Sequence, residues 1–403
     1  MKEIEIRRPS ARTSAWEKTL PGRVLGVWLL GVGLSAVAAG EPALRRFEFT
    51  QVEMAVTVRI SLYYADAETA TAAAKDAFSR LHALNAILSD YEPKSELRRL
   101  CDTAGEGKAI HVSPELWRVL EHAQKVARQS GGTFDVTVGP VVRLWRRARR
   151  QKELPSPEAL RQARDLVGYQ FVRLDAARQT VELLKKGMRI DLGGIAKGYA
   201  MDEALAVLER HGITRALVEA GGDMRLGGPP PGRAGWRVGI PPLDNPQGQP
   251  LGYLELSRVA VSTSGDVMQY VEIGGKRYSH VVDPRTGMAL TDHCRVMVVG
   301  PSGIAADAIS KAVGVLGPEK GLQLIDQIPG MAAMVTRAPQ GRIEHYESSR
   351  WKDLPQVRLR SSEKPAVQAP EGAGQHDRHD EQPQAEGGHV PYLAKTKLSR
   401  AAD

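Results

Sequence analysis

Hydrophobic and polar positions follow two different periods along the chain, and the changes between them predict strands and helices. Residues 47–64 alternate apolar with polar positions, which is typical of paired strands with one buried face. Residues 67–88 are rich in alanine and repeat their apolar positions at helical spacing. Further strands are expected at 172–184 (two strands), 215–220, 236–240, 254–263, 271–278 (a hairpin) and 296–300, and further helices at 113–130, 158–166, 201–211 and 302–316. This series predicts an α+β fold with sheets flanked by helices.

The two ends of the chain differ from its middle. Residues 1–38 join a basic region to an apolar, glycine-rich run that is long enough for a signal peptide and short for a membrane span. We therefore expect a signal peptide or an N-terminal anchor there, and a protein exported to the periplasm, either free or attached to the inner membrane. Residues 361–403 lack apolar periodicity and are rich in Glu, Gln, Pro and Gly, so we expect a disordered tail.

Charge and cysteine content narrow the class of function. The formal net charge is +8, and residues 1–38 contribute six basic and three acidic side chains to it. The remainder is only mildly basic and does not indicate nucleic-acid binding. Cys101 and Cys294 lie far apart in sequence and form no metal-binding pattern, so they either pair as a disulfide or stay as two buried thiols. Six basic residues surround Trp145 between 143 and 152, as a solvated helix face or as a docking surface for an acidic partner or a membrane.

The stretch with the clearest chemical signal is 189–202, Arg-Ile-Asp-Leu-Gly-Gly-Ile-Ala-Lys-Gly-Tyr-Ala-Met-Asp. A short apolar lead-in ends at Asp191, two glycines follow, and a helical pattern then begins. Gly193 and Gly194 allow a sharp turn and a close approach of the backbone to a ligand. Asp191 and Lys197 flank a helix N-terminus, where phosphates are favoured. The residues alone leave both a ligand site and a plain strand–helix turn open.

Three further stretches combine small residues with an acid or a histidine. They are Gly-Gly-Thr-Phe-Asp-Val-Thr-Val-Gly-Pro at 131–140, Glu-Ala-Gly-Gly-Asp at 219–223, and Ser-Thr-Ser-Gly-Asp at 262–266 followed by Tyr-Ser-His-Val-Val-Asp-Pro-Arg-Thr-Gly at 278–287. With the stretch at 189–202, this ordered series resembles the ApbE family of FAD:protein FMN transferases from about residue 48 to about residue 330. The resemblance implies a T-fold-like domain of mixed β-sheets and helices over residues 45–350, in one body or in two lobes with the flavin site between them.

The resemblance also implies an activity. Such an enzyme cleaves FAD, attaches the FMN half to a threonine or serine hydroxyl of an exported redox protein, and releases AMP. FAD would be the substrate, Mg²⁺ the cofactor and an acceptor flavoprotein subunit the partner. Phosphoryl transfer needs cations at the phosphate oxygens, an aligned acceptor and a proton acceptor. Two alternatives remain: an FAD-binding or delivery protein without transferase activity, and an FAD pyrophosphatase that gives FMN and AMP.

Particular residues are implicated by the same resemblance. His280 is expected to act as general base toward the acceptor hydroxyl, because histidine titrates near neutral pH. Asp283 either orients the site or only caps the Asp-Pro turn. From the residues alone, Met54 fits a strand core equally well and Tyr91 fits ordinary packing. The expected flavin-binding residues are Met54, Tyr91, Thr133, Phe134, Asp135, Asp191, Lys197, Gly221, Gly222, Ser264 and His280.

The expected metal ligands are Asp307 and the backbone carbonyl of Gly194, and one neighbouring position departs from the family pattern. Members of the family often place a threonine ligand four residues after the aspartate, where this chain has Lys311. Positions i and i+4 share a helical face, so the ammonium can approach Asp307. A protonated lysine cannot ligate a metal. Either the metal uses Asp307, Gly194 and FAD phosphates alone, or Lys311 replaces part of the cation's charge, or the two residues form a surface ion pair.

Overall fold

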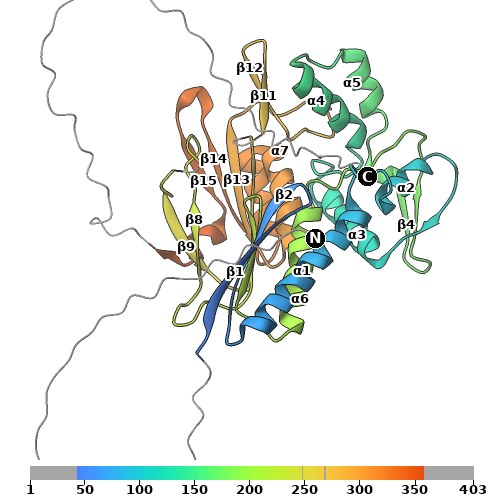
Figure 1. The fold of residues 1–403 in the computed structure, drawn as a ribbon. Coiled ribbons are helices and arrows are strands. Elements are labelled where there is room, and N and C mark those ends of the chain that lie inside the picture. Colours follow the sequence, from blue (N-terminus) through green and yellow to red (C-terminus); the bar gives the residue numbers. More distant parts are fainter. Residues whose placement is uncertain (1–42, 247, 267–268, 358–403) are drawn as a thin grey trace, which may run out of the picture. The chain divides into compact units, whose positions relative to one another are not determined.

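An eight-stranded antiparallel sheet forms the centre of the fold (Figure 1). The strand order is β1-β2-β6-β7-β10-β13-β14-β15, and each neighbouring pair is antiparallel. The α+β prediction is confirmed, although the ladders are antiparallel rather than mixed in direction. The strands are β1 (Arg45–Glu53), β2 (Val56–Tyr64), β6 (Ala216–Ala220), β7 (Asp223–Leu226), β10 (Ala260–Gly265), β13 (Cys294–Gly300), β14 (Ala332–Arg337) and β15 (Glu344–Glu347).

The computed structural model describes residues 43–246, 248–266 and 269–357, and all of them belong to one compact unit rather than two lobes. The signal or anchor segment and the tail predicted from the sequence lie outside these residues. Within the described part, none of the helices has the length and apolar character needed to span a membrane.

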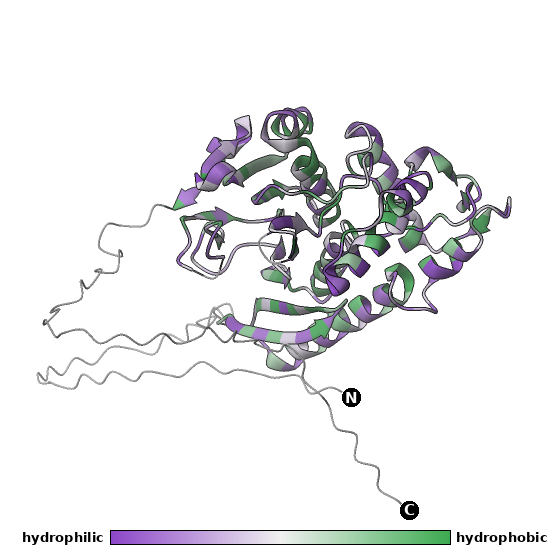
Figure 2. Ribbon diagram, turned by 90° about the horizontal axis from the view of Figure 1, so that it is seen from above, coloured by the Kyte–Doolittle hydropathy of each residue, from purple (hydrophilic) through white to green (hydrophobic). Residues whose placement is uncertain are grey.

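Long helices cover one face of the large sheet. These are α1 (Ala67–Leu88), α6 (Ala196–Arg210) and α7 (Gly303–Gln327), and they share one hydrophobic core with the sheet. Strand β13 shows how the period of two works, because Val296 and Val298 face this core while Met297 and Val299 face the other side. Both faces of β13 are therefore buried and apolar, and Figure 2 shows hydrophobic, green stretches on strands and helices.

The opposite face of the large sheet is covered by a three-stranded sheet of order β16-β9-β8. Its strands are β8 (Trp236–Ile240), β9 (Gly252–Leu256) and β16 (Gln356–Val357). The prediction of one strand over residues 254–263 is therefore wrong, because its two halves belong to different sheets. Arg258 lies between β9 and β10 with a φ of 56°, and this left-handed residue redirects the chain.

The remaining elements form an outer layer around the helices. Ser113 caps α3 (Pro114–Gln129) by accepting a hydrogen bond from the Leu116 N–H, as its sequence predicts. α4 (Gly139–Gln151) and α5 (Pro157–Arg164) pack with the hairpin of β11 (Tyr270–Ile273) and β12 (Lys276–Ser279) around buried Trp145. The other outer elements are α2 (Glu96–Asp102), β3 (Ile110–His111), β4 (Val172–Asp175), β5 (Thr180–Leu183) and the short 3₁₀ turn η1 (Tyr169–Phe171). Two more 3₁₀ turns lie elsewhere: η2 (Pro339–Gly341) falls between β14 and β15, and η3 (Ser349–Asp353) packs Trp351 into the core on the opposite face of the large sheet.

Two further sequence predictions concern α7 and the cysteines. The helix expected to end at residue 316 does break at Gly317 (φ 77°, ψ 177°), but a second helical segment follows at once. Pro318 suits the first turn of that segment, so the proline begins a helix instead of closing one. Cys101 and Cys294 are buried free thiols, so the disulfide alternative is wrong.

Candidate functional site

A cavity of about 960 Å³ brings most of the predicted site residues together. It lies where the turns of two hairpins, the start of α6, the first segment of α7 and the loop before α4 meet. Asp307 stands directly behind it, bonded to Lys311, whereas Asp283 does not line it. The predicted residues that line the cavity are Met54, Tyr91, Thr133, Phe134, Asp135, Asp191, Gly194, Lys197, Gly221, Gly222, Ser264, His280 and Lys311.

Two tight hairpin turns form one wall of this cavity. Met54–Ala55 joins β1 to β2, and Gly221–Gly222 joins β6 to β7. The turns are neighbours because β2 pairs with β6. All four turn residues have positive φ, which glycine adopts freely. Met54 (φ 50°) and Ala55 (φ 62°) pay a steric cost of about 1 kcal/mol each, so the fold holds the methionine at the cavity against its local preference.

Asp223, the residue after the glycine turn, holds Lys197 at the base of the cavity. Its fully buried carboxylate accepts hydrogen bonds from the Ser262 hydroxyl (2.8 Å) and the Thr263 N–H (2.9 Å). The other carboxylate oxygen pairs with the Lys197 ammonium. Burial opposes the charge of Lys197, but Asp223 and Asp307 outweigh it and raise the pKa of the lysine. The ammonium is therefore a fixed positive charge at this end of the cavity.

A close crossing of two helices places Asp307 beside this charge. Helices α6 and α7 meet at Gly198 and Gly303, where a Cβ on Gly198 would lie 2.1 Å from the Gly303 carbonyl oxygen. Only glycine permits this approach, and it allows the Asp307 carboxylate to accept a hydrogen bond from the Gly198 N–H (3.0 Å). Asp202 of α6 in turn accepts from the Gly303 (2.8 Å) and Ile304 (2.9 Å) N–H groups and caps α7.

Lys311 occupies the remaining side of Asp307. Its ammonium is bonded to the Asp307 carboxylate and lies 3.2 Å from the Ser310 hydroxyl oxygen. Its stem packs on Gly194, because a Cβ on that glycine would lie 3.4 Å from Lys311 Cγ. Burial opposes ionisation of Asp307, but Lys311 and Lys197 outweigh it and lower the pKa of the carboxyl. Of the three predicted metal-site residues, Asp307 thus binds the ammonium of Lys311 and Gly194 packs against its stem.

These residues do not fit a divalent cation in their present arrangement. Mg²⁺ takes about six oxygen ligands in near-octahedral geometry. Here one oxygen of Asp307 is bonded to Lys311 and the other to the Gly198 N–H. Within the described ranges, no three His, Cys, Asp or Glu side chains cluster as a metal site. A metal would have to displace Lys311 from Asp307 first.

Arg146 of α4 is a site residue that sequence reasoning missed. Its guanidinium bonds to Asp90 and to Asp191 (2.7 Å), and it stacks on the Tyr91 ring with the guanidinium carbon 4.3 Å from the ring centroid. Tyr91 is 70% exposed, so the opposite face of its ring is open to a planar ligand. The basic run around Trp145 was the available signal. Two of its arginines, Arg146 and Arg149, line the cavity, which neither a solvated face nor a docking surface describes.

The loop before α4 places Thr133, Phe134 and Asp135 in the cavity wall. The Asp135 carboxylate accepts from the Thr137 N–H (2.8 Å), the Thr137 hydroxyl (2.7 Å) and the Tyr169 N–H (2.7 Å). Burial raises the pKa of Asp135, although these bonds oppose the shift. The Asp135 carboxylate therefore stabilises the conformation of the loop through these hydrogen bonds.

His280 lines the cavity, but it does not titrate near neutral pH as predicted from the sequence. Its Nδ1 lies 3.2 Å from the Gln269 carbonyl oxygen, which can only accept, so the proton belongs on Nδ1 and the lone pair on Nε2. Burial, aided by the charges of Lys311, Arg149 and Lys197, lowers the pKa of His280 to about 4. The imidazole is thus neutral near pH 7 and can accept a proton at Nε2.

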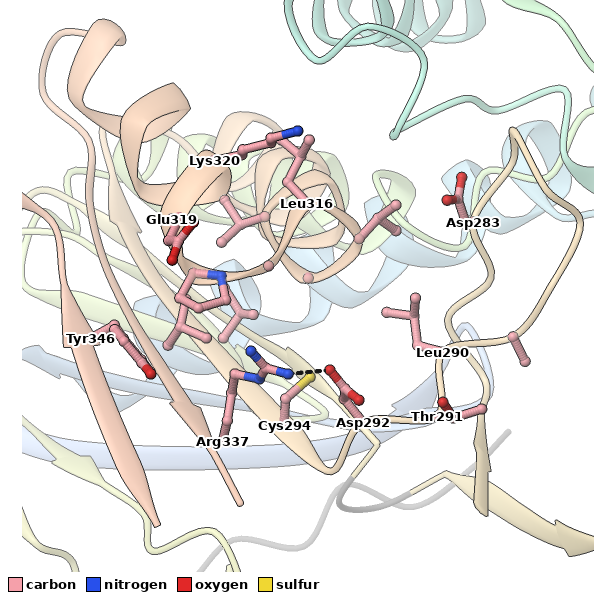
Figure 3. Close-up of a pocket in the computed structure, with 18 of the residues that line it drawn as sticks. Asp283, Leu290, Thr291, Asp292, Cys294, Leu316, Glu319, Lys320, Arg337 and Tyr346 are labelled. Carbon is pink, nitrogen blue, oxygen red and sulfur yellow. Dashed lines mark hydrogen bonds and ion pairs between the residues drawn. The ribbon is translucent and has the colours of Figure 1, made fainter. Parts of the chain in front are cut away.

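Asp283 belongs to a smaller cavity instead. Its carboxylate accepts from the Arg285 N–H (2.9 Å) and pairs with the Arg285 guanidinium (2.9 Å), which stabilises its own turn. Figure 3 shows Asp283 on a loop that faces α7, in a cavity of about 600 Å³ that also contains Cys294 and the Arg337–Asp292 ion pair. This placement favours the turn-capping alternative for Asp283.

Comparison with known proteins agrees with this geometry. A model of the ApbE family matches residues 54–335. An FAD:protein FMN transferase of Treponema pallidum is 32% identical over 326 residues, covering 77% of this chain and 89% of that protein. That of Haemophilus influenzae is 28% identical and covers 83% and 99%. The structure of flavin transferase ApbE from Vibrio cholerae is similar with a TM-score of 0.68 at 27% identity, over 77% of this chain and 99% of that one. The Pseudomonas stutzeri flavinyl transferase ApbE gives 0.68 at 28%, over 77% and 97%.

Proposed function

We propose a mechanism for the transfer that this chain performs. The chain belongs to the ApbE family and is an FAD:protein FMN transferase. It moves the FMN half of FAD to a threonine or serine hydroxyl of a redox protein and releases AMP. The phosphorus of FMN forms a bond to the acceptor oxygen, and its bond to the bridging pyrophosphate oxygen breaks. The observation that carries this proposal is the convergence of His280, Lys197 and Lys311 on one cavity.

His280 takes the proton in this scheme. The hydrogen bond from Nδ1 to the Gln269 carbonyl fixes the ring, so Nε2 faces the acceptor hydroxyl as a base. The proton passes from the hydroxyl to Nε2 as the oxygen attacks. Asp283 has no step in the scheme, because its carboxylate is bonded to Arg285 outside the main cavity.

The charged side chains bind and orient FAD. The Lys197 ammonium, held by Asp223, faces the phosphates at the N-terminal end of α6, where backbone N–H groups also favour anions. Tyr91, stacked on Arg146, offers its free face to the isoalloxazine ring. Met54 lies on the wall formed by the hairpin turns and excludes water from the same region.

Magnesium, which the sequence resemblance predicts, would neutralise the phosphate oxygens if bound. The oxygen groups that would hold it, if Lys311 released Asp307, are the Asp307 carboxylate, the Gly194 carbonyl and the Ser310 hydroxyl. Because Lys311 holds Asp307, no step above depends on the metal. Export to the periplasm, anchoring to the inner membrane and an exported acceptor subunit complete the proposal. Export and anchoring rest on the sequence of residues 1–38, outside the described structure, and the exported acceptor rests on the resemblance to the family.

Mass spectrometry of a flavoprotein acceptor after incubation with the protein and FAD tests the proposal. The expected result is a gain of one FMN on a threonine or serine, with one AMP released for each. Release of FMN and AMP with an unmodified acceptor would support the pyrophosphatase instead. Tight FAD binding without either product, for two different acceptors, would support a delivery protein.

A further inference from the structure

The proposed transfer needs a cation beside the pyrophosphate of FAD, and the inference about that cation rests on the proposed function. We propose that the Lys311 ammonium takes the place of a divalent metal ion in this chain, so that FAD binds without Mg²⁺. Lys311, Asp307, Ser310 and Gly194 form the group involved, and the geometry of this group carries the proposal.

The position of the ammonium is well defined by its neighbours. Asp307 is fully buried, and its carboxylate is oriented from behind by the Gly198 N–H (3.0 Å). Ser310 Oγ lies 3.2 Å from Lys311 Nζ and itself donates to the Asp307 carbonyl (2.8 Å). The lysine stem is packed on Gly194. The ammonium therefore lies beside a carboxylate and a hydroxyl, and the Lys311 side chain lines the cavity.

The charge balance around this group also favours an organic cation. Lys311 and Lys197 each pair with a buried aspartate, so the four charges cancel before a ligand enters. The negative charge of a pyrophosphate then needs additional cations. Arg149 and Arg295 also line the cavity, and within the described ranges neither forms an ion pair with a carboxylate. Adding Mg²⁺ next to the Lys311 ammonium would place two cations on one carboxylate, which is unfavourable.

A lysine can replace a metal ion in binding because the pyrophosphate oxygens accept N–H hydrogen bonds from it. Charge-assisted bonds of this kind are among the strong ones in proteins. Because Asp307 already balances the charge of the ammonium, Lys311 supplies N–H donors, and the arginines that line the cavity supply the net positive charge. Removing Lys311 should therefore weaken FAD binding about tenfold or more in the absence of metal.

The test measures FAD affinity of the full chain by flavin fluorescence, in EDTA and in excess Mg²⁺. We expect the unaltered protein to bind FAD equally well in both, within about twofold. Lys311→Thr should bind about tenfold more weakly in EDTA and regain affinity with Mg²⁺. Lys320→Thr is the matched control, since it makes the same change at an exposed site on the same helix. It should behave like the unaltered protein.

Direct metal binding provides a second readout. With FAD present, Mn²⁺ should show no stoichiometric site by electron paramagnetic resonance in the unaltered protein, and one site in Lys311→Thr. A loss of FAD affinity of tenfold or more when EDTA is added to the unaltered protein would overturn the proposal, and this arm needs no variant to fold. A stoichiometric Mn²⁺ site in that protein would overturn it as well.

Failure of this inference can be told apart from failure of the proposed function. FMN transfer to an acceptor that stops in EDTA would leave the transferase intact and remove the role of Lys311. Metal-independent FAD binding without any transfer would support the role of Lys311 and contradict the proposed transferase mechanism.

Discussion

The glycine crossing of α6 and α7 leads to a prediction about one methyl group. In Gly198→Ala the new Cβ would lie 2.1 Å from the Gly303 carbonyl oxygen and 2.7 Å from Asp307 Cβ. Carbon contacts normally lie at about 3.5 Å, so the helices must separate by about 1 Å. Overpacking of this kind costs about 1–3 kcal/mol. The separation also breaks the hydrogen bond from the Gly198 N–H to the charged Asp307, which contributes about 1.5–3 kcal/mol.

Helix propensity acts in the opposite direction. Alanine is favoured over glycine in a helix by about 1 kcal/mol. The net loss in the free energy of unfolding should therefore be about 2–5 kcal/mol. Urea unfolding followed by circular dichroism measures it. Gly314→Ala is the matched control in α7, because its Cβ would meet only Val296 Cγ2, at 3.8 Å. That variant should be as stable as the unaltered protein or more so, by up to about 1 kcal/mol. Equal stability of the two variants would refute the steric argument.

Three other predictions follow from the site. Arg146→Lys keeps the charge but loses the planar guanidinium that joins Asp90 to Asp191, so FAD affinity measured by fluorescence titration should fall about tenfold. Arg147→Lys, on the exposed side of α4, is the control and should leave FAD affinity unchanged. Equal effects of the two changes would contradict the placement of Arg146 in the FAD site. Lys197→Met leaves Asp223 as an unpaired buried charge and should lower the free energy of unfolding by about 3 kcal/mol in urea titration. Adding Asp223→Asn should restore part of the lost stability. If the double variant is no more stable than Lys197→Met, the unpaired charge is not the cause of the loss. Because the neutral form of His280 is the base and its pKa is lowered to about 4, kcat/KM for FMN transfer should be retained as pH falls through 6.5 and be lost only as pH approaches the lowered value. A pH profile that falls near 6.5 would refute this, and His280→Asn should lower kcat about 100-fold or more with FAD affinity preserved.

Much of the site could be predicted because its residues follow turns that sequence chemistry reveals. Gly221 and Gly222 need positive φ, so the sequence indicates a tight turn there, and the ordered series of motifs indicates which turns line the candidate site. Arg146 could not be predicted in the same way. The orientation of α4 depends on Trp145, which is buried against Tyr278 and donates a hydrogen bond to the Gly287 carbonyl, and both partners lie more than 130 residues away.

The errors in the fold have a similar origin. The alternation over residues 254–263 is continuous in sequence, and only the backbone angle of Arg258 divides it between two sheets. Asp283 belongs to the same motif as His280, yet the neighbouring Arg285 binds its carboxylate and the turn carries it toward the smaller cavity. Periodicity and motif order identify elements and candidate residues. They do not say which way a side chain faces once distant elements pack.

The two thiols have a consequence for where this protein can fold. Burial raises the pKa of Cys101, although the hydrogen bond that its Sγ accepts from the Ile190 N–H (3.3 Å) opposes the shift. Burial also raises the pKa of Cys294 to about 12, so neither cysteine is a ready thiolate. The folded unit therefore contains no bond whose formation depends on an oxidant. Its native state is equally accessible on the reducing and the oxidising side of a membrane. The timing of any export relative to folding is then a matter of the transport route and not of sulfur chemistry.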